Sequence, residues 1–110
     1  MESKRQQKIN KLLQKDLGDI FQRESADLFG RAMITVTKVQ VTSDLSIARV
    51  YLSIYGSDAN KIIHQVRIHS SEIRKQLGLK IRNQLRHVPL LQYFIDDSLD
   101  YIANIENLLK

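Results

Sequence analysis

The chain has no cysteine and no tryptophan, and its 110 residues include only one proline and four glycines. Disulfide bonds and thiolate metal sites are therefore excluded, and a reducing, cytoplasmic compartment is the expected location. No apolar run is longer than a few residues, so we expect no membrane-spanning segment. The polar start, Met1 to Arg5, lacks the apolar stretch of a secretory signal.

Positive charge is concentrated in two parts of the chain. Residues 61–86 hold seven Lys or Arg and one acid, Glu72, so their net charge of +6 exceeds the +5 of the whole chain. Residues 1–15 hold five basic residues and one acid. A segment with this much uncompensated charge repels itself unless an anion lies against it, which indicates a phosphate backbone as partner.

The first half of the chain predicts one helix and a β-hairpin. Ser3 and Gln6 have capping-box spacing, and apolar residues then recur at helical intervals to about Arg23. β-branched residues dominate 33–41, where a shift of apolar parity between Val36 and Val39 predicts a bulge or a strongly twisted edge. Clean alternation predicts a second strand over 47–55.

The second half predicts two helices, a strand and a last helix. The first helix runs from about 59 until its pattern loosens at 69–71. Ser71 is then expected to cap a second helix over about 72–85, with Ile73, Leu77, Ile81 and Leu85 on one stripe and Lys75, Arg82 and Arg86 opposite. A strand over 90–95 follows Pro89, and a helix over 98–110 ends the chain. The long helical connection permits a parallel strand pair, which predicts an α+β fold with a small mixed sheet.

Two groups of residues, taken in order, resemble the pattern of the ribosome-binding factor A family. The first lies on the expected hairpin: Thr35, Val36, Thr37, Val39, Val41, Asp44, Leu45, Ala48 and Val50 to Ser53. The second lies further on: Ile73, Arg74, Leu77, Gly78, Arg86, Pro89, Phe94 and Asp96 to Ser98. The resemblance covers about residues 5 to 100.

This resemblance implies a single KH-like domain of type II over 1–110, ordered α-β-β-α-kink-α-β, with a core at about 5–97 and a C-terminal helix over 98–110. It implies a monomer that binds the small ribosomal subunit and its rRNA near the decoding region during late maturation, with a part in rRNA processing and cold adaptation. Other assembly factors are further expected partners, and no cofactor is expected. The family's Ala-x-Gly kink corresponds here to His69, Ser70 and Ser71.

The candidate RNA-binding residues come from the two basic segments and the kink: Lys4, Arg5, Lys8, Lys11, Lys15, Arg67, His69, Ser70, Ser71, Arg74, Lys75, Lys80, Arg82 and Arg86. Arg and Lys form charge-assisted contacts with phosphate. For the lysines of the first helix, simple solvation is an equally good interpretation. A plain junction between helices is nearly as good an interpretation of residues 69–71 as contact with RNA.

No pattern of catalytic or metal-binding residues is evident. Of the three histidines, His64 and His69 are five residues apart and so do not share a helix face, and no cysteine or carboxylate is in register with them, which argues against a metal site. Asp96, Asp97 and Asp100 are typical of a turn and a helix start. Tyr51 and Tyr55 could stack on bases, but half-buried strand tyrosines are common, and we favour the structural interpretation. We therefore expect a binding protein and no enzyme.

Two other functions remain open. The first is a general KH-like RNA-binding module that is not dedicated to ribosome assembly. The second is a protein-interaction module that uses the tyrosine face or the acidic C-terminal helix, and its binding would be insensitive to nuclease and salt. A small enzyme is the least favoured alternative, since the candidate acids and bases do not converge in the sequence.

Overall fold

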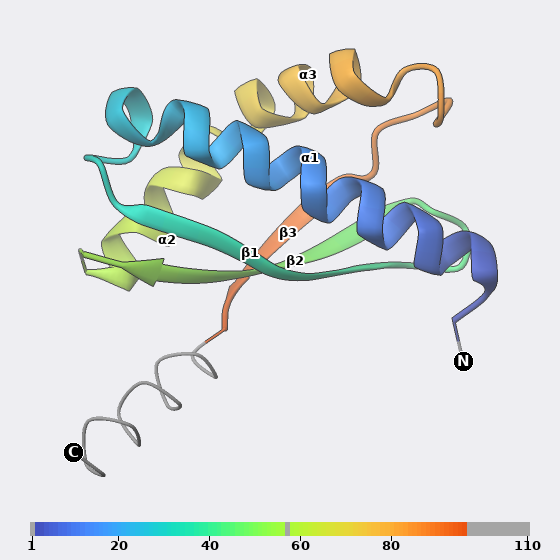
Figure 1. Ribbon diagram of the computed structural model, residues 1–110, viewed down its shortest axis with the longest axis horizontal. Helices are drawn as coiled ribbons and strands as arrows, with labels where there is room; N and C mark the ends of the chain where they lie inside the picture. The colour runs from blue at the N-terminus through green and yellow to red at the C-terminus, as the bar shows by residue number, and fades with distance from the viewer. Residues whose placement is uncertain (1, 57, 97–110) are drawn as a thin grey trace, which may run out of the picture.

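The computed structural model describes residues 2–56 and 58–96 (Figure 1). The elements in this part of the chain are α1 (Lys4–Leu28), β1 (Met33–Val41), β2 (Ile47–Tyr55), α2 (Ala59–Ile68), α3 (Ser70–Ile81) and β3 (Leu90–Ile95). All three predicted strands are confirmed at the expected residues, as is the α+β class. The expected helix over 98–110 lies outside the described residues.

The long helix α1 begins with the predicted capping box. Ser3 Oγ accepts a hydrogen bond from the Gln6 backbone N–H at 3.1 Å, and Gln6 Oε1 accepts one from the Ser3 N–H at 2.8 Å. The helix continues past Arg23, where the sequence predicted its end, to Leu28. The extension brings Phe29 into the core, 5.7 Å from the ring of Phe21, and Gly30 then ends the helix with a φ of 58°.

The sheet has the order β1-β2-β3, with an antiparallel pair and a parallel pair. β1 and β2 form the predicted hairpin, and their register shifts between Val36 and Lys38. This shift is the predicted bulge, and it leaves Thr37 without a partner residue on β2. α2 and α3 form the crossover that makes the β2–β3 pair parallel. The outer strands β1 and β3 therefore each have one free edge with outward backbone N–H and C=O groups.

The core lies between one face of the sheet and the three helices. On β2 the residues Ala48, Val50, Leu52 and Ile54 are buried on this face, while Arg49 and Tyr55 are exposed on the other. α1 packs along β1, α2 packs on β2 and β3, and α3 packs beside α1 (Figure 1). The sheet thus has one covered face and one open face, and both of its edges lie next to helices.

The boundaries of α3 differ from the prediction at both ends. The helix begins at Ser70 with His69 as the residue before its first turn, and no side chain caps it. The prediction that Ser71 is the N-cap is therefore wrong, because Ser71 lies within the first turn. The regular helix ends at Ile81, before the predicted end at about Leu85. Leu85 is nonetheless buried, and its N–H donates to the Ile81 carbonyl at 2.9 Å, so the apolar stripe continues beyond the helix.

The length of α1, 25 residues, would suffice to cross a bilayer. Its sequence is rich in Lys, Arg, Asp and Glu. Within residues 2–56 and 58–96, no helix combines sufficient length with sufficient apolarity to be a membrane span.

Candidate nucleic-acid interface

The junction of α2 and α3 is a break of a single residue, His69. Its backbone has φ −93° and ψ 15°, and its own N–H and C=O groups are hydrogen-bonded to the two flanking helices. The His69 N–H donates to the Gln65 carbonyl at 3.0 Å, and the His69 carbonyl accepts from the Ile73 N–H at 3.0 Å. The His69 side chain is half-buried, with its ring edge-on to Phe29 at 6.2 Å. The break is therefore stabilised from inside the protein, and Ser70 and Ser71 are the junction residues next to it.

A groove of 480 Å³ lies between this junction and the outer edge of β3. Arg67 and Ser70 line it on the helix side, and Leu91 to Phe94 line it on the strand side. Arg67 Nη2 donates to the Tyr93 carbonyl at 2.8 Å, so one outward carbonyl of the β3 edge is already satisfied. The structure thus brings two predicted site residues, Arg67 and Ser70, to one groove along an open strand edge.

Tyr93 forms the floor of this groove. The residue is 3% exposed, and its ring meets Phe21 edge-on at 6.4 Å. Its hydroxyl lies 3.4 Å from Ser70 Oγ. Burial raises the pKa of Tyr93 to about 12, although the Ser70 hydroxyl and the charge of Arg74 act in the opposite direction. The phenol is therefore neutral at physiological pH. Its contact with Ser70 links the α2–α3 junction to the sheet.

Two cations of α3 are used within the protein. Arg74 is half-buried, and it donates from Nη2 to the Val88 carbonyl at 3.0 Å and from Nε to the Pro89 carbonyl at 3.3 Å. It therefore ties α3 to the segment that leads into β3. Lys80 Nζ lies 3.9 Å from Asp19 Oδ2 on α1, and both side chains remain partly exposed. That ion pair contributes little stability, at most about 1 kcal/mol.

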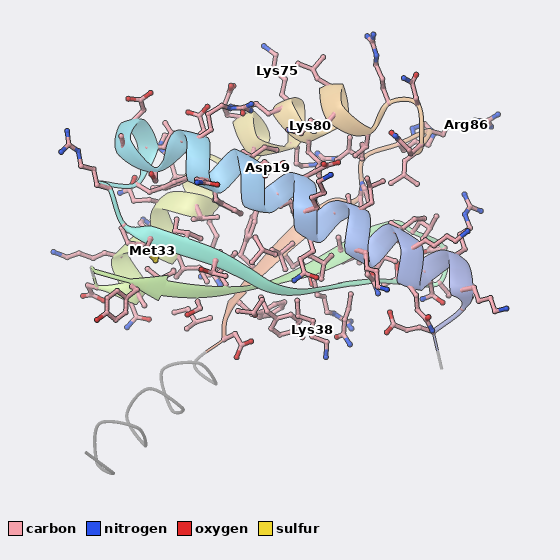
Figure 2. The ribbon with its side chains drawn as sticks, viewed as in Figure 1. Asp19, Met33, Lys38, Lys75, Lys80 and Arg86 are labelled. Atoms are coloured by element: carbon pink, nitrogen blue, oxygen red, sulfur yellow. The ribbon has the colours of Figure 1, made fainter. Side chains whose placement is uncertain are left out.

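Three other cations of this region, Lys75, Arg82 and Arg86, are exposed and make no ion pair with any described residue. Figure 2 shows Lys75 on the outer side of α3 and Arg86 in the segment beyond its end. The prediction that all three share one face of a single helix is wrong, because Arg82 and Arg86 follow the last helical residue, Ile81. Their charges are nevertheless not neutralised by acids in the described part of the chain.

The five basic residues in the first half of α1 are all exposed, and none pairs with an acid among residues 2–56 and 58–96: Lys4, Arg5, Lys8, Lys11 and Lys15. The start of α1 and the segment after α3 lie at the same end of the long axis of the molecule (Figure 1). Lys4, Arg5 and Lys8 therefore lie toward the same end of the molecule as Arg86. Lys11 and Lys15 instead line a different groove, beside β1.

The open face of the sheet carries an aromatic pair. Tyr51 stacks on Phe94 with ring centroids 5.4 Å apart and an angle of 28° between the rings, and Lys38 Nζ lies 6.0 Å from the Tyr51 ring centroid. This packing agrees with the structural interpretation of Tyr51. Tyr55, by contrast, is 69% exposed. Within the described ranges no three His, Cys, Asp or Glu side chains gather closely enough to hold a metal ion.

Reasoning from the sequence missed the strand side of the groove, Gln92 to Phe94. The alternation of Leu91 and Tyr93 with Gln92 and Phe94 is visible in the sequence, and it separates buried from exposed positions. What it does not reveal is that β3 is an edge strand. Only the strand order shows that this row of residues borders the groove.

The sequence matches the family model described as ribosome-binding factor A over residues 5–109. A ribosome-binding factor A from Cytophaga hutchinsonii is 43% identical, and the match covers 100% of this chain and 84% of that protein. One from Flavobacterium johnsoniae is 47% identical over 99% of this chain and 85% of that protein.

Solved structures agree in fold. The crystal structure of ribosome-binding factor A from Thermus thermophilus matches with a TM-score of 0.71 at 16% identity, covering 82% of this chain and 94% of that one. A homology model of the Thermus thermophilus protein, fitted into a cryo-EM map of a 30S–ribosome-binding factor A complex, matches with a TM-score of 0.65 at 20% identity, over 80% of this chain and 91% of that one. The family model and the relatives cover nearly all of this sequence, and the chain therefore belongs to the ribosome-binding factor A family.

Proposed function

We propose that this chain binds the small ribosomal subunit during late maturation, on its rRNA near the decoding region, without performing chemistry. Family membership supports a ribosomal partner, and a homology model of the Thermus protein, similar in fold, was fitted into a map of a 30S complex. The observation that carries the proposal is the set of exposed cations Lys75, Arg82 and Arg86, which have no acidic partner among the described residues.

The cations divide into those that shape the surface and those that remain for a ligand. Arg74 and Lys80 hold α3 against the segment before β3 and against α1. Lys75 lies on that anchored helix, Arg82 and Arg86 follow its end, and Lys4, Arg5 and Lys8 add charge at the start of α1. Guanidinium and ammonium groups in such an arrangement contact phosphates, and these contacts position a protein without reading bases. We therefore propose recognition of the shape and backbone of folded rRNA.

The groove beside β3 would receive an unpaired stretch of the same rRNA. Ser70 and Ser71 lie in the first turn of α3, whose backbone N–H groups can donate to a phosphate. Arg67 adds positive charge at the groove, and Phe94, which is 39% exposed, can stack on a base. His69 positions this turn through its packing on Phe29.

The proposed mechanism is differential binding. A rigid surface that fits an rRNA helix in an immature position favours that position by its difference in affinity between the two arrangements. The protein then dissociates when the mature arrangement, or another factor, competes for the same surface. No covalent step is required.

The test is charge reversal of Lys75, Arg82 and Arg86 together, each to Glu. Three lost phosphate contacts should weaken co-sedimentation with small-subunit precursors by at least about tenfold and reduce the log–log salt slope by about 2 to 3. The matched control reverses three exposed cations that lie outside α3 and do not line the groove, Lys38, Arg49 and Lys61, and gives the same change in net charge.

Equal loss in both triple variants would mean that net charge alone drives binding, and unchanged binding in the α3 variant would overturn the proposal. A dedicated assembly factor should also prefer small-subunit precursors over unrelated structured RNA. Equal affinity for both would instead favour the general RNA-binding module.

A further inference from the structure

The free edge of β1 is partly covered by amide side chains from α1. Gln6 Nε2 donates to the Val41 carbonyl at 3.1 Å, and Asn10 Oδ1 accepts from the Val41 N–H at 2.9 Å. Gln14 Nε2 donates to the Val36 carbonyl at 3.2 Å and to the Thr37 carbonyl at 3.3 Å. These amides recur every four residues and so lie on one face of α1. They occupy backbone groups that would otherwise pair with another strand.

The next position in this series is Gly18, and the coverage stops there. A glycine inside a helix costs about 1 kcal/mol relative to alanine. A Cβ at Gly18 would meet no atom within 4 Å, and the φ of Gly18 is not in the left-handed region. Neither close packing nor backbone conformation therefore requires a glycine here. Because Gly18 has no side chain, the space beside β1 stays open at this position.

That space is a groove of 860 Å³ between α1 and the first half of β1. Gln14, Gly18 and Gln22 line it on the helix side, and residues 33–36 line it on the strand side. Along an antiparallel strand, every second residue directs its backbone N–H and C=O away from the paired strand. Ile34 lies two residues before Val36 on the same side of the bulge, so its backbone groups point outward, as those of Val36 do. No described side chain makes a hydrogen bond with the backbone of residues 33–35, in contrast to Val36 and Val41.

The charges around the groove indicate what could occupy it. Lys11, Lys15 and Arg31 line it and have no acidic partner among the described residues, while its one acid, Asp19, is already paired with Lys80. Figure 2 shows Asp19 on α1 and Met33 at the start of β1. The Met33 side chain is 66% exposed on the open face of the sheet. An extended segment here would meet cations on its helix side and an apolar surface on the other.

The hydrogen-bonding groups of the β1 edge match a peptide backbone better than the phosphate backbone of a nucleic acid. The edge at Ile34 presents both a donor and an acceptor, whereas a phosphate group offers acceptors only. A peptide backbone offers both at the spacing of a strand. We propose that this groove binds an extended peptide of a partner protein, in which acidic and apolar residues alternate, and that the peptide pairs with β1 as a fourth strand.

The test uses a capped synthetic octapeptide in which glutamate and valine alternate, with a lysine–valine peptide as the charge control. The glutamate peptide should bind the full chain, and at saturation it should slow amide hydrogen exchange at Ile34 by at least about tenfold. The lysine peptide should bind at least about tenfold more weakly, because it meets Lys11, Lys15 and Arg31.

Two substitutions at one position separate groove closure from loss of folding. Gly18→Gln would extend the amide series over the Ile34 backbone and should weaken peptide binding at least about tenfold. Gly18→Ala leaves most of the groove open and should retain binding within about threefold. Both replace a helical glycine, so both should raise the melting temperature, and loss of binding in Gly18→Gln then cannot be attributed to unfolding.

Three results would overturn the proposal. The first is that neither peptide protects Ile34, and the second is that Gly18→Gln binds as well as Gly18→Ala. The third is that single-stranded RNA, or a second copy of the chain at high concentration, protects Ile34 while the glutamate peptide does not. The α3 triple variant should keep its peptide affinity, because its three changes lie outside this groove.

Discussion

The two edges of the sheet are protected in different ways. The β1 edge is covered by neutral amides from one long helix, up to the gap at Gly18. The β3 edge is covered at Tyr93 by a guanidinium, that of Arg67, which comes from the end of α2. An amide satisfies a backbone group without adding charge, whereas a guanidinium satisfies one and leaves positive charge beside it. The guanidinium at the β3 edge suits a phosphate backbone. At the β1 edge, the uncovered backbone of residues 33–35 lies beside Lys11, Lys15 and Arg31, which suits an acidic peptide strand.

The largest expected effect lies at the β3 edge at high pH. Tyr93 has its pKa raised to about 12 from 10.0, so the folded protein holds this proton more tightly than the unfolded chain does. The resulting stability is fully present below pH 10 and is lost as the pH rises through about 12, a decrease of about 2 to 3 kcal/mol. Urea unfolding between pH 9 and 12 measures it.

Tyr93→Phe should remove most of this alkaline decrease, and Tyr55→Phe, at an exposed position, should keep it. If both variants lose stability with pH as the parent does, burial of Tyr93 is not its source. The amides that cover β1 do not titrate, so the pH dependence distinguishes the two edges.

The next effect concerns the two arginines near β3. Arg74→Met removes two hydrogen bonds to the carbonyls of Val88 and Pro89 and should cost about 2 kcal/mol, measured by urea unfolding at pH 7. Arg67→Met removes one bond from an exposed side chain and should cost about 1 kcal/mol. Lys75→Met is the control and should change stability by less than about 0.5 kcal/mol. A larger loss for Arg67→Met than for Arg74→Met would reverse the structural and ligand-facing roles assigned to these two residues.

The smallest effect tests the cover over β1. Gln14→Leu leaves the Val36 and Thr37 carbonyls without their side-chain donor and should cost about 1 kcal/mol in thermal or urea unfolding. Gln22→Leu, on the same helix, changes an exposed residue whose side chain makes no hydrogen bond within the described chain, and it should cost less than about 0.5 kcal/mol. Equal costs would show that the amide series does not protect the strand edge.

The strands could be placed from the sequence because their signal is local. Alternation over 47–55 and the change of parity between Val36 and Val39 are properties of consecutive residues, and they predicted both the bounds and the bulge. Helix ends were harder to place. α1 continues to Leu28 because Phe29 packs on Phe21, a contact that helical periodicity does not encode. α3 stops at Ile81 although Leu85 keeps the four-residue spacing, because a buried residue can follow the helix in a turn.

The candidate site was predicted in part. The basic segments and the junction at 69–71 were visible in the sequence, but the separate uses of their cations were not. Arg74 and Arg82 are the same residue type, as are Lys80 and Lys75. Only the folded structure shows that Arg74 and Lys80 have partners within the protein. Gln6, Asn10 and Gln14 are visible in the sequence as polar residues at four-residue spacing. Only the structure shows that their amides hydrogen-bond to the β1 backbone.

Reading the chain residue by residue was enough to place the strands and most helical turns, to mark the buried positions and to locate the positive charge. These properties depend on residue type and on spacing along the chain. The tertiary structure decided which strands became edges, which cations were bound internally and where the cover over β1 stops. Those outcomes depend on pairs such as Gln14 with Val36 or Arg67 with Tyr93, which are distant in the sequence and meet only after the helices pack on the sheet.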